Sequence, residues 1–266
     1  MATSFCWSQH RTSELVVKNK PILWGVFFFV MFNITGCGTT EIAQNPSNTQ
    51  TFETSNLEKD VIIASTKDLR DVQYVSGKGR LYYHSNGESE RLGMEYVLNS
   101  EREIYSLKNR LGIPIADIQL EVDSILFVDR LQKKALKWHR DYPPAHIPGM
   151  IPPIRLYDVI HYPNWIDRAV SFEQSKTLVR AQIPDIGYLY LDASNYALGQ
   201  LIYKNEWELE VRDRKSYKNS MIGRTFQLRN IDRTTQILIH LIELEWQTDG
   251  HVQELSIPTT FERINF

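Results

Sequence analysis

The residues that could do chemistry are histidines and acids, and their spacing gives few catalytic pairs. His240 and Glu243 come nearest to a metal-binding pair. On a β-strand, however, positions three apart point to opposite faces, so these two side chains cannot easily share an ion. Glu208 and Glu210 share a strand face and could stand about 7 Å apart, as carboxylates do in glycosidases. The unbroken alternation around them predicts an open, solvated face rather than a cleft.

Longer catalytic motifs are missing from the chain. It carries no His-Glu-x-x-His motif, no cysteine ligand pair and no Gly-x-Ser-x-Gly elbow, so we predict neither a metal site nor a cofactor. The glycine-rich stretch Ser76–Gly79 lacks the Walker spacing, and we interpret it as a turn before a strand at Leu81. No catalytic residue is predicted.

The richest local cluster combines cations with aromatic rings. It comprises Lys137, Trp138, His139, Arg140 and Tyr142. Clusters of this kind can bind anions, glycans or phospholipid headgroups. The sequence also allows a basic helix C-terminus that interacts with its own dipole. We therefore name residues 137–142 as a candidate binding surface and leave both interpretations open.

Residues 1–36 have the three parts of a secretory signal peptide. A net-basic stretch with Lys18 and Lys20 precedes an uncharged apolar run from Pro21 to Thr35, which ends in small residues. As a helix, this run would span roughly 22 Å, which is short of the ~30 Å hydrocarbon core. An uncleaved membrane anchor is therefore the less favoured alternative.

The segment closes on Ile34-Thr35-Gly36-Cys37, which resembles the lipobox of bacterial lipoproteins. The resemblance covers only about the first 40 residues and does not extend to the folded body. It implies that a diacylglycerol is attached to Cys37 through a thioether, that cleavage follows Gly36, and that the new amino terminus is acylated. Two or more acyl chains anchor a protein stably, whereas one chain, at about 0.8 kcal/mol per buried CH₂, is marginal.

The residues around the lipobox add a location and a tether. Gly38 stands where the family associates Asp with inner-membrane retention, so the resemblance implies the outer membrane in a diderm host. Residues 37–58 are polar without hydrophobic periodicity and predict a disordered tether with a reach of roughly 25 Å.

Loss of Cys6 with the signal peptide would leave no free thiol. The 30 basic and 32 acidic residues give a charge of −2, which argues against a nucleic-acid partner.

Residues 59–142 predict an α/β segment. Apolar residues at three- and four-residue steps predict a helix over 88–111, ended by Gly112, and Ser124 could cap a second helix over 125–138. The β signals of this segment are Val61–Ala64, Gln73–Val75, Arg80–His84 and Ile118–Val122.

Residues 143–153 hold five prolines and predict an extended crossing to a β-rich domain over 154–266. The strands expected in that domain are Ala169–Glu173, Thr177–Ile183, Tyr188–Asp192, Leu198–Tyr203, Glu206–Arg212, Thr225–Asn230, Thr235–Trp246 and His251–Ile257. A hairpin turn is expected at Thr248–Gly250. The fold class is therefore α+β, with an antiparallel sandwich or barrel-like second part.

These features favour a non-enzymatic binding or assembly component of the bacterial envelope, anchored through Cys37. Its partner would be an envelope protein, a glycan or a lipid. The alternative is an envelope hydrolase with a site at the 138–167 junction. In that hydrolase, His139 or His146 would work with Asp158 or Asp167.

Overall fold

The structure is a computed structural model, and it describes residues 51–54, 59–85, 87–144, 151 and 153–266. The predicted signal peptide, Gly36, Cys37, most of the tether and His146 lie outside the described residues. Among the helices that are described, none has the length and apolar character needed to cross a bilayer.

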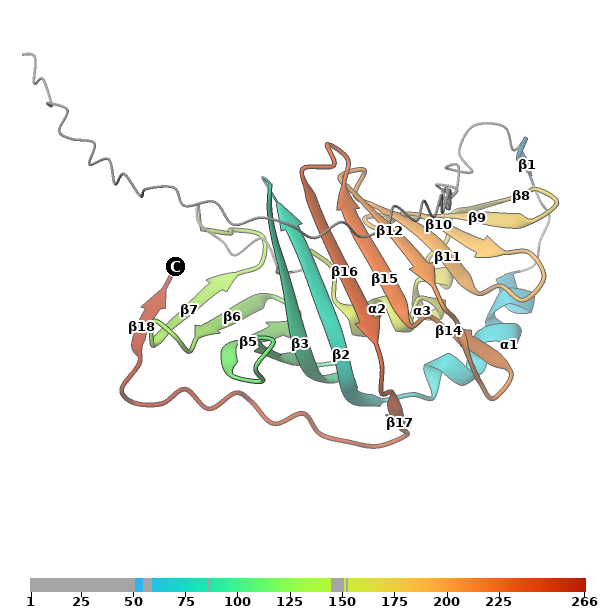
Figure 1. The fold of residues 1–266 in the computed structure, drawn as a ribbon. Coiled ribbons are helices and arrows are strands. Elements are labelled where there is room, and N and C mark those ends of the chain that lie inside the picture. The colour runs from blue at the N-terminus through green and yellow to red at the C-terminus, as the bar shows by residue number, and fades with distance from the viewer. Residues whose placement is uncertain (1–50, 55–58, 86, 145–150, 152) are drawn as a thin grey trace, which may run out of the picture. The chain divides into compact units, whose positions relative to one another are not determined.

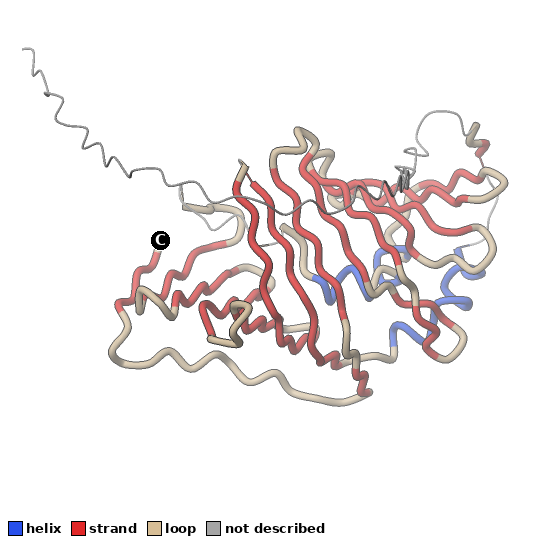
Figure 2. The backbone as a smooth tube through the Cα atoms, in the orientation of Figure 1, coloured by secondary structure: helices blue, strands red, loops and turns tan. Residues whose placement is uncertain are grey.

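Strands make up most of the described chain, and helices are few (Figure 2). The helices are α1 (Lys59–Arg70), α2 (Leu156–Ile160) and α3 (Pro163–Ile166). The strands are β1 (Glu53–Thr54), β2 (Tyr74–Ser85), β3 (Glu88–Asn99), β4 (Arg102–Lys108), β5 (Pro114–Glu121), β6 (Ser124–Asp129), β7 (Lys134–His139), β8 (Ser171–Gln174), β9 (Leu178–Ile183), β10 (Gly187–Asp192), β11 (Leu198–Tyr203), β12 (Trp207–Arg212), β13 (Lys215–Tyr217), β14 (Ser220–Ile222), β15 (Thr225–Asn230), β16 (Thr235–Leu241), β17 (Glu245–Gln247) and β18 (Glu262–Asn265). The predicted α+β class is confirmed.

One large sheet contains all the described strands except β13 and β14, which pair with each other. Its order is β1-β8-β9-β10-β11-β12-β15-β16-β2-β3-β4-β5-β6-β7-β18, with β17 paired to β2. The pairs are antiparallel apart from β7 with β18, which is parallel. Strands from both sides of residues 143–153 therefore lie in one sheet, joined where β2 pairs with β16. The domain boundary expected there stays a prediction.

The sheet has an inner face, which the helices cover, and an outer face. On the inner face, Val211, Phe226, Ile239 and Leu81 stand in register across four neighbouring strands, and all four are buried. Helix α2 packs against this row, and in Figure 1 the helices lie behind the sheet. These four residues belong to one large buried apolar cluster, whose removal from water stabilises the fold by roughly 25 cal/mol per Å² of apolar surface.

The helix expected over 88–111 is wrong, because this segment forms β3, a short turn and β4. Buried inner-face residues recur at every second position of β3, from Leu92 to Leu98. The carboxamide oxygen of Asn99 accepts the backbone N–H groups of Glu101 and Arg102, and this closes the turn. The predicted helical stripe had combined residues from both faces of two strands.

The helix expected over 125–138 is also wrong, because this segment forms β6 and β7. The Asp129 carboxylate accepts the N–H groups of Leu131 and Gln132 in the turn between these strands. Lys133 completes the turn with a φ of 55°, in the left-handed region. Leu131, which the helix would have buried, is 69% exposed.

Three smaller expectations also fail. The run Val61–Ala64 lies in helix α1 instead of a strand. Residues Ser76–Gly79 lie inside β2 and form no turn. Gly77 is required there because a Cβ atom would stand 2.1 Å from the carbonyl oxygen of Glu243. Residues 251–257 form no strand, so Thr248–Gly250 joins no hairpin.

The other predicted strands are close to those observed. Residues 80–84 and 118–121 lie in β2 and β5, and the strands expected from Ala169 to Asn230 match β8 to β12 and β15 to within a few residues. The long strand expected over 235–246 is divided into β16 and β17. In β12, Leu209 and Val211 are buried, so the predicted one wet face is confirmed.

Candidate functional site

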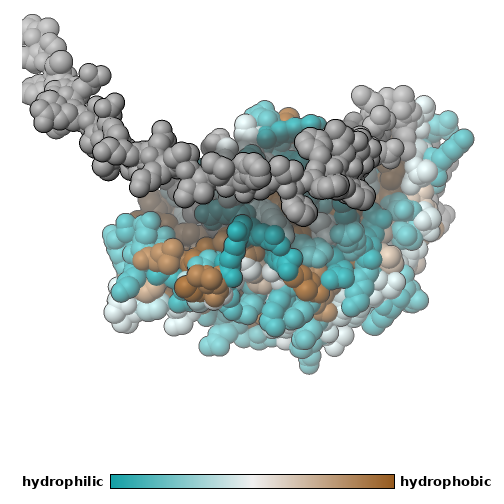
Figure 3. All heavy atoms as spheres, in the orientation of Figure 1, coloured by the Kyte–Doolittle hydropathy of each residue, from teal (hydrophilic) through white to brown (hydrophobic). Residues whose placement is uncertain are grey.

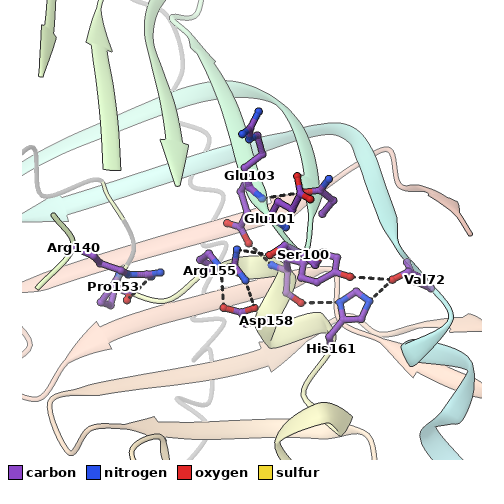
Figure 4. Close-up of polar contacts among 12 residues, drawn as sticks. Val72, Ser100, Glu101, Glu103, Arg140, Pro153, Arg155, Asp158 and His161 are labelled. Carbon is purple, nitrogen blue, oxygen red and sulfur yellow. Dashed lines mark hydrogen bonds and ion pairs between the residues drawn. The ribbon is translucent and has the colours of Figure 1, made fainter. Parts of the chain in front are cut away.

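A buried polar network joins helix α2 to the inner face of β4, at the junction where the sequence suggested a site (Figure 4). Its central group is Glu103, whose side chain is fully buried between β3 and β5. The Glu103 carboxylate accepts the hydroxyl of Tyr105 at 2.6 Å and the backbone N–H of Tyr157 at 2.5 Å. An acidic side chain therefore holds the first turn of a short helix that has no side-chain cap of its own.

Burial is the main influence on the proton affinity of Glu103. Removal from water raises its pKa to about 7, although the hydrogen bonds from Tyr105 and Tyr157 favour the charged form. Burial also raises the pKa of Tyr105 well above its ordinary value, so its hydroxyl stays protonated and continues to donate.

Arg155 fixes the other side of the same turn. Its guanidinium donates two hydrogen bonds to the Asp158 carboxylate, at 2.9 and 2.6 Å, and a third to the carbonyl of Ser100 at 2.9 Å. This is the bidentate geometry in which an arginine and a carboxylate bind most strongly. Arg155 and Asp158 therefore neutralise each other's charge, and neither is free to pair with a substrate.

His161 is buried behind this pair. Its ring stacks on Tyr157 at a centroid distance of 3.8 Å, and its two nitrogens face the carbonyl oxygens of Tyr157 and Val72. Burial lowers the pKa of His161, so the neutral ring donates to one carbonyl at a time. A histidine whose nitrogens both face the backbone is a poor general base for an external substrate.

Little space is left where helix α2 packs on β12 and β15. A small cavity there holds about 10 Å³, and its lining includes Val159, Ile160 and Phe226. This is about the volume that one water molecule needs. In the described residues, the network therefore anchors the first turn of helix α2, and the space beside that helix has room for about one water molecule.

The candidate surface at 137–142 is divided between the two faces of β7. Trp138 is 2% exposed and points into the core, whereas Lys137 and His139 are exposed on the opposite face. Tyr142 packs near the His139 ring at 5.4 Å, and Arg140 donates to the carbonyl of Pro153 at 2.8 Å. A ligand on this surface would meet Lys137, His139 and Tyr142 but not Trp138.

The residues proposed for a hydrolase do not converge. Asp158 is paired with Arg155, and Asp167 is paired with Arg70 at 3.1 Å. His139 lies beside Asp141, at 3.9 Å, on an exposed face. His146 lies outside the described residues.

The other acid and histidine pairs are held by partners of their own. Glu208 and Glu210 share the outer face as expected, and Arg229 stands 3.3 and 3.6 Å from them. His240 contacts the hydroxyl of Thr225 at 2.8 Å, and Glu243 pairs with Lys78 at 3.1 Å. Within the described ranges, no group of three or more His, Cys, Asp or Glu side chains could hold a metal ion.

Sequence reasoning missed a hollow on the outer face, which we call the outer groove. It has a volume of about 400 Å³. Its floor consists of two rows of side chains, each in register across β16, β2 and β3. The first row is Leu238, Tyr82 and Arg91, and the second row is Gln236, His84 and Ser89. Arg110, from the loop after β4, joins the lining. The alternation within β2 and β3 could have placed four of these residues on one face, but only the structure brings β16 beside them.

Comparisons with known proteins give the fold and little more. No protein-family model matches the chain, and no curated protein matches it. A solved DUF1329 family protein from Desulfovibrio piger ATCC 29098 covers 71% of this chain and 91% of its own, with a TM-score of 0.51 and 5% identity, so the two share a fold.

Two further solved structures are weaker likenesses. A LolA superfamily protein from Nitrosomonas europaea covers 72% of this chain and 94% of its own, with a TM-score of 0.49 and 6% identity. A putative outer membrane lipoprotein-sorting protein domain from Vibrio parahaemolyticus covers 73% and 95%, with a TM-score of 0.47 and 10% identity. Neither likeness carries a conclusion about this chain.

Proposed function

We propose that this protein is a bacterial envelope lipoprotein, anchored through lipidated Cys37, whose folded body is a non-enzymatic binding component. The anchor rests on the lipobox Ile34-Thr35-Gly36-Cys37 at the end of an apolar run. Gly38 after the cysteine favours the outer membrane in a diderm host. Two or more acyl chains at Cys37 would give stable membrane anchoring, whereas one acyl chain alone is marginal.

The binding role rests on one structural observation, the paired state of the inner face. Arg155 pairs with Asp158, and Glu103 and His161 contact backbone groups, so these four side chains already have partners. Because these inner-face groups are already paired, we infer that a partner meets the outer surface of the body. The partner is an envelope protein, glycan or lipid, and no nucleic acid is expected for a chain of charge −2.

Acyl labelling of cells that express cysteine variants tests the anchor. The Cys37→Ser variant should incorporate no labelled fatty acid and should accumulate as a precursor, because the attachment site is lost. Cys6→Ser is the matched control, since Cys6 lies in the segment that is removed, and it should label like the parent chain. Normal labelling and cleavage of Cys37→Ser would refute the proposed anchor.

The hydrolase alternative has its own test. Alanine at His139 and at His146 should leave envelope phenotypes unchanged if the body only binds. Unchanged envelope phenotypes in both variants, at normal protein levels, would refute the hydrolase.

A further inference from the structure

The outer groove contains two guanidinium groups without a carboxylate partner. Neither Arg91 nor Arg110 forms an ion pair with a described residue, although Arg229, Arg212 and Arg130 all do. The Arg91 guanidinium lies over the Tyr82 ring at 4.9 Å from its centroid. Stacking of this kind restrains the planar fork of donors without using it, so the fork remains free for a planar anion.

The rest of the lining is suited to hydroxyl groups and to C–H surfaces. Tyr82 and Leu238 form a small apolar floor. The adjoining row contributes the amide of Gln236, the imidazole of His84 and the hydroxyl of Ser89. His84 and Ser89 already contact each other at 2.7 Å, whereas the Gln236 side chain hydrogen-bonds to no described residue. The groove is open to solvent, and its volume of about 400 Å³ lies in the range of about 300–1,000 Å³ that is usual for small-molecule sites.

The position of the groove within the sheet narrows the class of ligand. Strands β16, β2 and β3 are each paired on both sides, so no edge is free here for an extended peptide to add a strand. A bare inorganic anion would use the arginines and leave Tyr82 and Gln236 unused.

Glu90 also reaches the lining, but it stands in register with Tyr83 and so belongs to the opposite strand face from Arg91.

We propose that the outer groove binds an acidic saccharide. The carboxylate of the sugar pairs with the guanidinium groups of Arg91 and Arg110, the C–H face of the ring packs on Tyr82 and Leu238, and the hydroxyls bond to Gln236. This rests on the proposed binding role of the folded body but not on the lipid anchor. In Figure 3, the described atoms on the viewed side are mainly hydrophilic, with several hydrophobic patches between them.

Calorimetric titration of the full-length protein in detergent with trigalacturonate tests the proposal. The probe should bind in the micromolar to millimolar range, and acetate and the neutral trisaccharide maltotriose should bind far more weakly. Arg91→Gln and Arg110→Gln should each weaken binding by about tenfold or more, since each removes a charge-assisted hydrogen-bond donor. Arg91→Lys should also weaken binding, because a point charge replaces the fork.

Arg80→Gln is the matched control. Arg80 is exposed on the outer face of β2, the strand next to that of Arg91; it has no ion pair with a described residue and does not line the outer groove. Its substitution should change the affinity by less than about twofold. Absence of trigalacturonate binding, equal binding of acetate or maltotriose, or an equal loss in Arg80→Gln would each overturn the proposal. Because the readout is soluble sugar binding, such a failure is separate from a failure of acylation at Cys37.

Discussion

The inner and outer faces of the sheet carry similar polar side chains in opposite situations. On the inner face, buried Arg155 gives three hydrogen bonds to Asp158 and Ser100. On the outer face, Arg91 and Arg110 line an open groove without a described carboxylate partner. The difference shows that residue type alone does not mark a site, because burial and pairing decide whether a charge is structural or available.

Trp138 gives the sharpest test of which face a residue serves. Trp138→Ala should lower the free energy of unfolding by about 3–5 kcal/mol, because it opens a cavity in the core. His139→Ala, the next residue on the exposed face, should change it by less than about 0.5 kcal/mol. Chemical denaturation of both variants measures the difference. Similar losses would contradict the division of the predicted 137–142 cluster between the faces.

Glu103 tests the buried polar network. Glu103→Ala should lower the free energy of unfolding by about 3 kcal/mol, because the hydroxyl of Tyr105 and the N–H of Tyr157 lose a buried acceptor. Glu95 is the control, since it lies on neighbouring β3, where it forms a partly exposed ion pair with Lys108. Glu95→Ala should cost about 1 kcal/mol or less. A Glu103 variant as stable as the Glu95 variant would mean that the network does not hold α2.

The pH dependence of stability isolates the Glu103 carboxyl. Its folded pKa of about 7 lies above its ordinary 4.5, so between these values the folded state binds more protons than the unfolded state. Its contribution is therefore full below about pH 4.5 and is lost as the pH rises through 7, and about 2 kcal/mol of it should disappear between pH 5 and 7. The lowered pKa of His161 acts in the opposite direction, with stability lost as the pH falls below 6.5.

Comparison with Glu103→Gln separates these two groups, because the variant keeps His161. Denaturation from pH 5 to 7 should show the parent protein losing stability relative to Glu103→Gln. Parallel pH profiles would show that the Glu103 carboxyl has an ordinary pKa.

The groove arginines should have the smallest effect on stability. Arg91→Gln and Arg110→Gln should each change the unfolding free energy by less than about 1 kcal/mol, since each removes at most an exposed cation–π contact. Thermal melting without ligand measures this. A large loss in either variant would place these residues with the structural arginines of the inner face.

The sequence predicts the second half of the fold well and the first half poorly, for a physical reason. Strands such as β12 have one buried and one wet face, so their alternation is easy to read. Strand β6 is apolar on both faces, because residues Leu255 and Ile257 pack over Leu126 and Val128 on the outer side. Such double burial removes the two-residue period and leaves an apolar run that resembles a helix.

The two polar regions depend on contacts that are distant along the chain. Glu103 meets Tyr157 across 54 positions, and the groove needs β16 beside β2. No spacing of residues along the sequence predicts either arrangement. The predicted lipobox is different, because its resemblance rests on a short contiguous segment that can be recognised from the residues alone.

Hydrogen–deuterium exchange of the full-length protein, with and without trigalacturonate, tests the division between a closed inner face and a binding outer face most directly. With trigalacturonate bound, we expect slower amide exchange in peptides that cover 80–91, 108–113 and 235–239, and no change in exchange over 103–107 or 155–161. Protection centred on α2 and β4, or no protection anywhere, would contradict it.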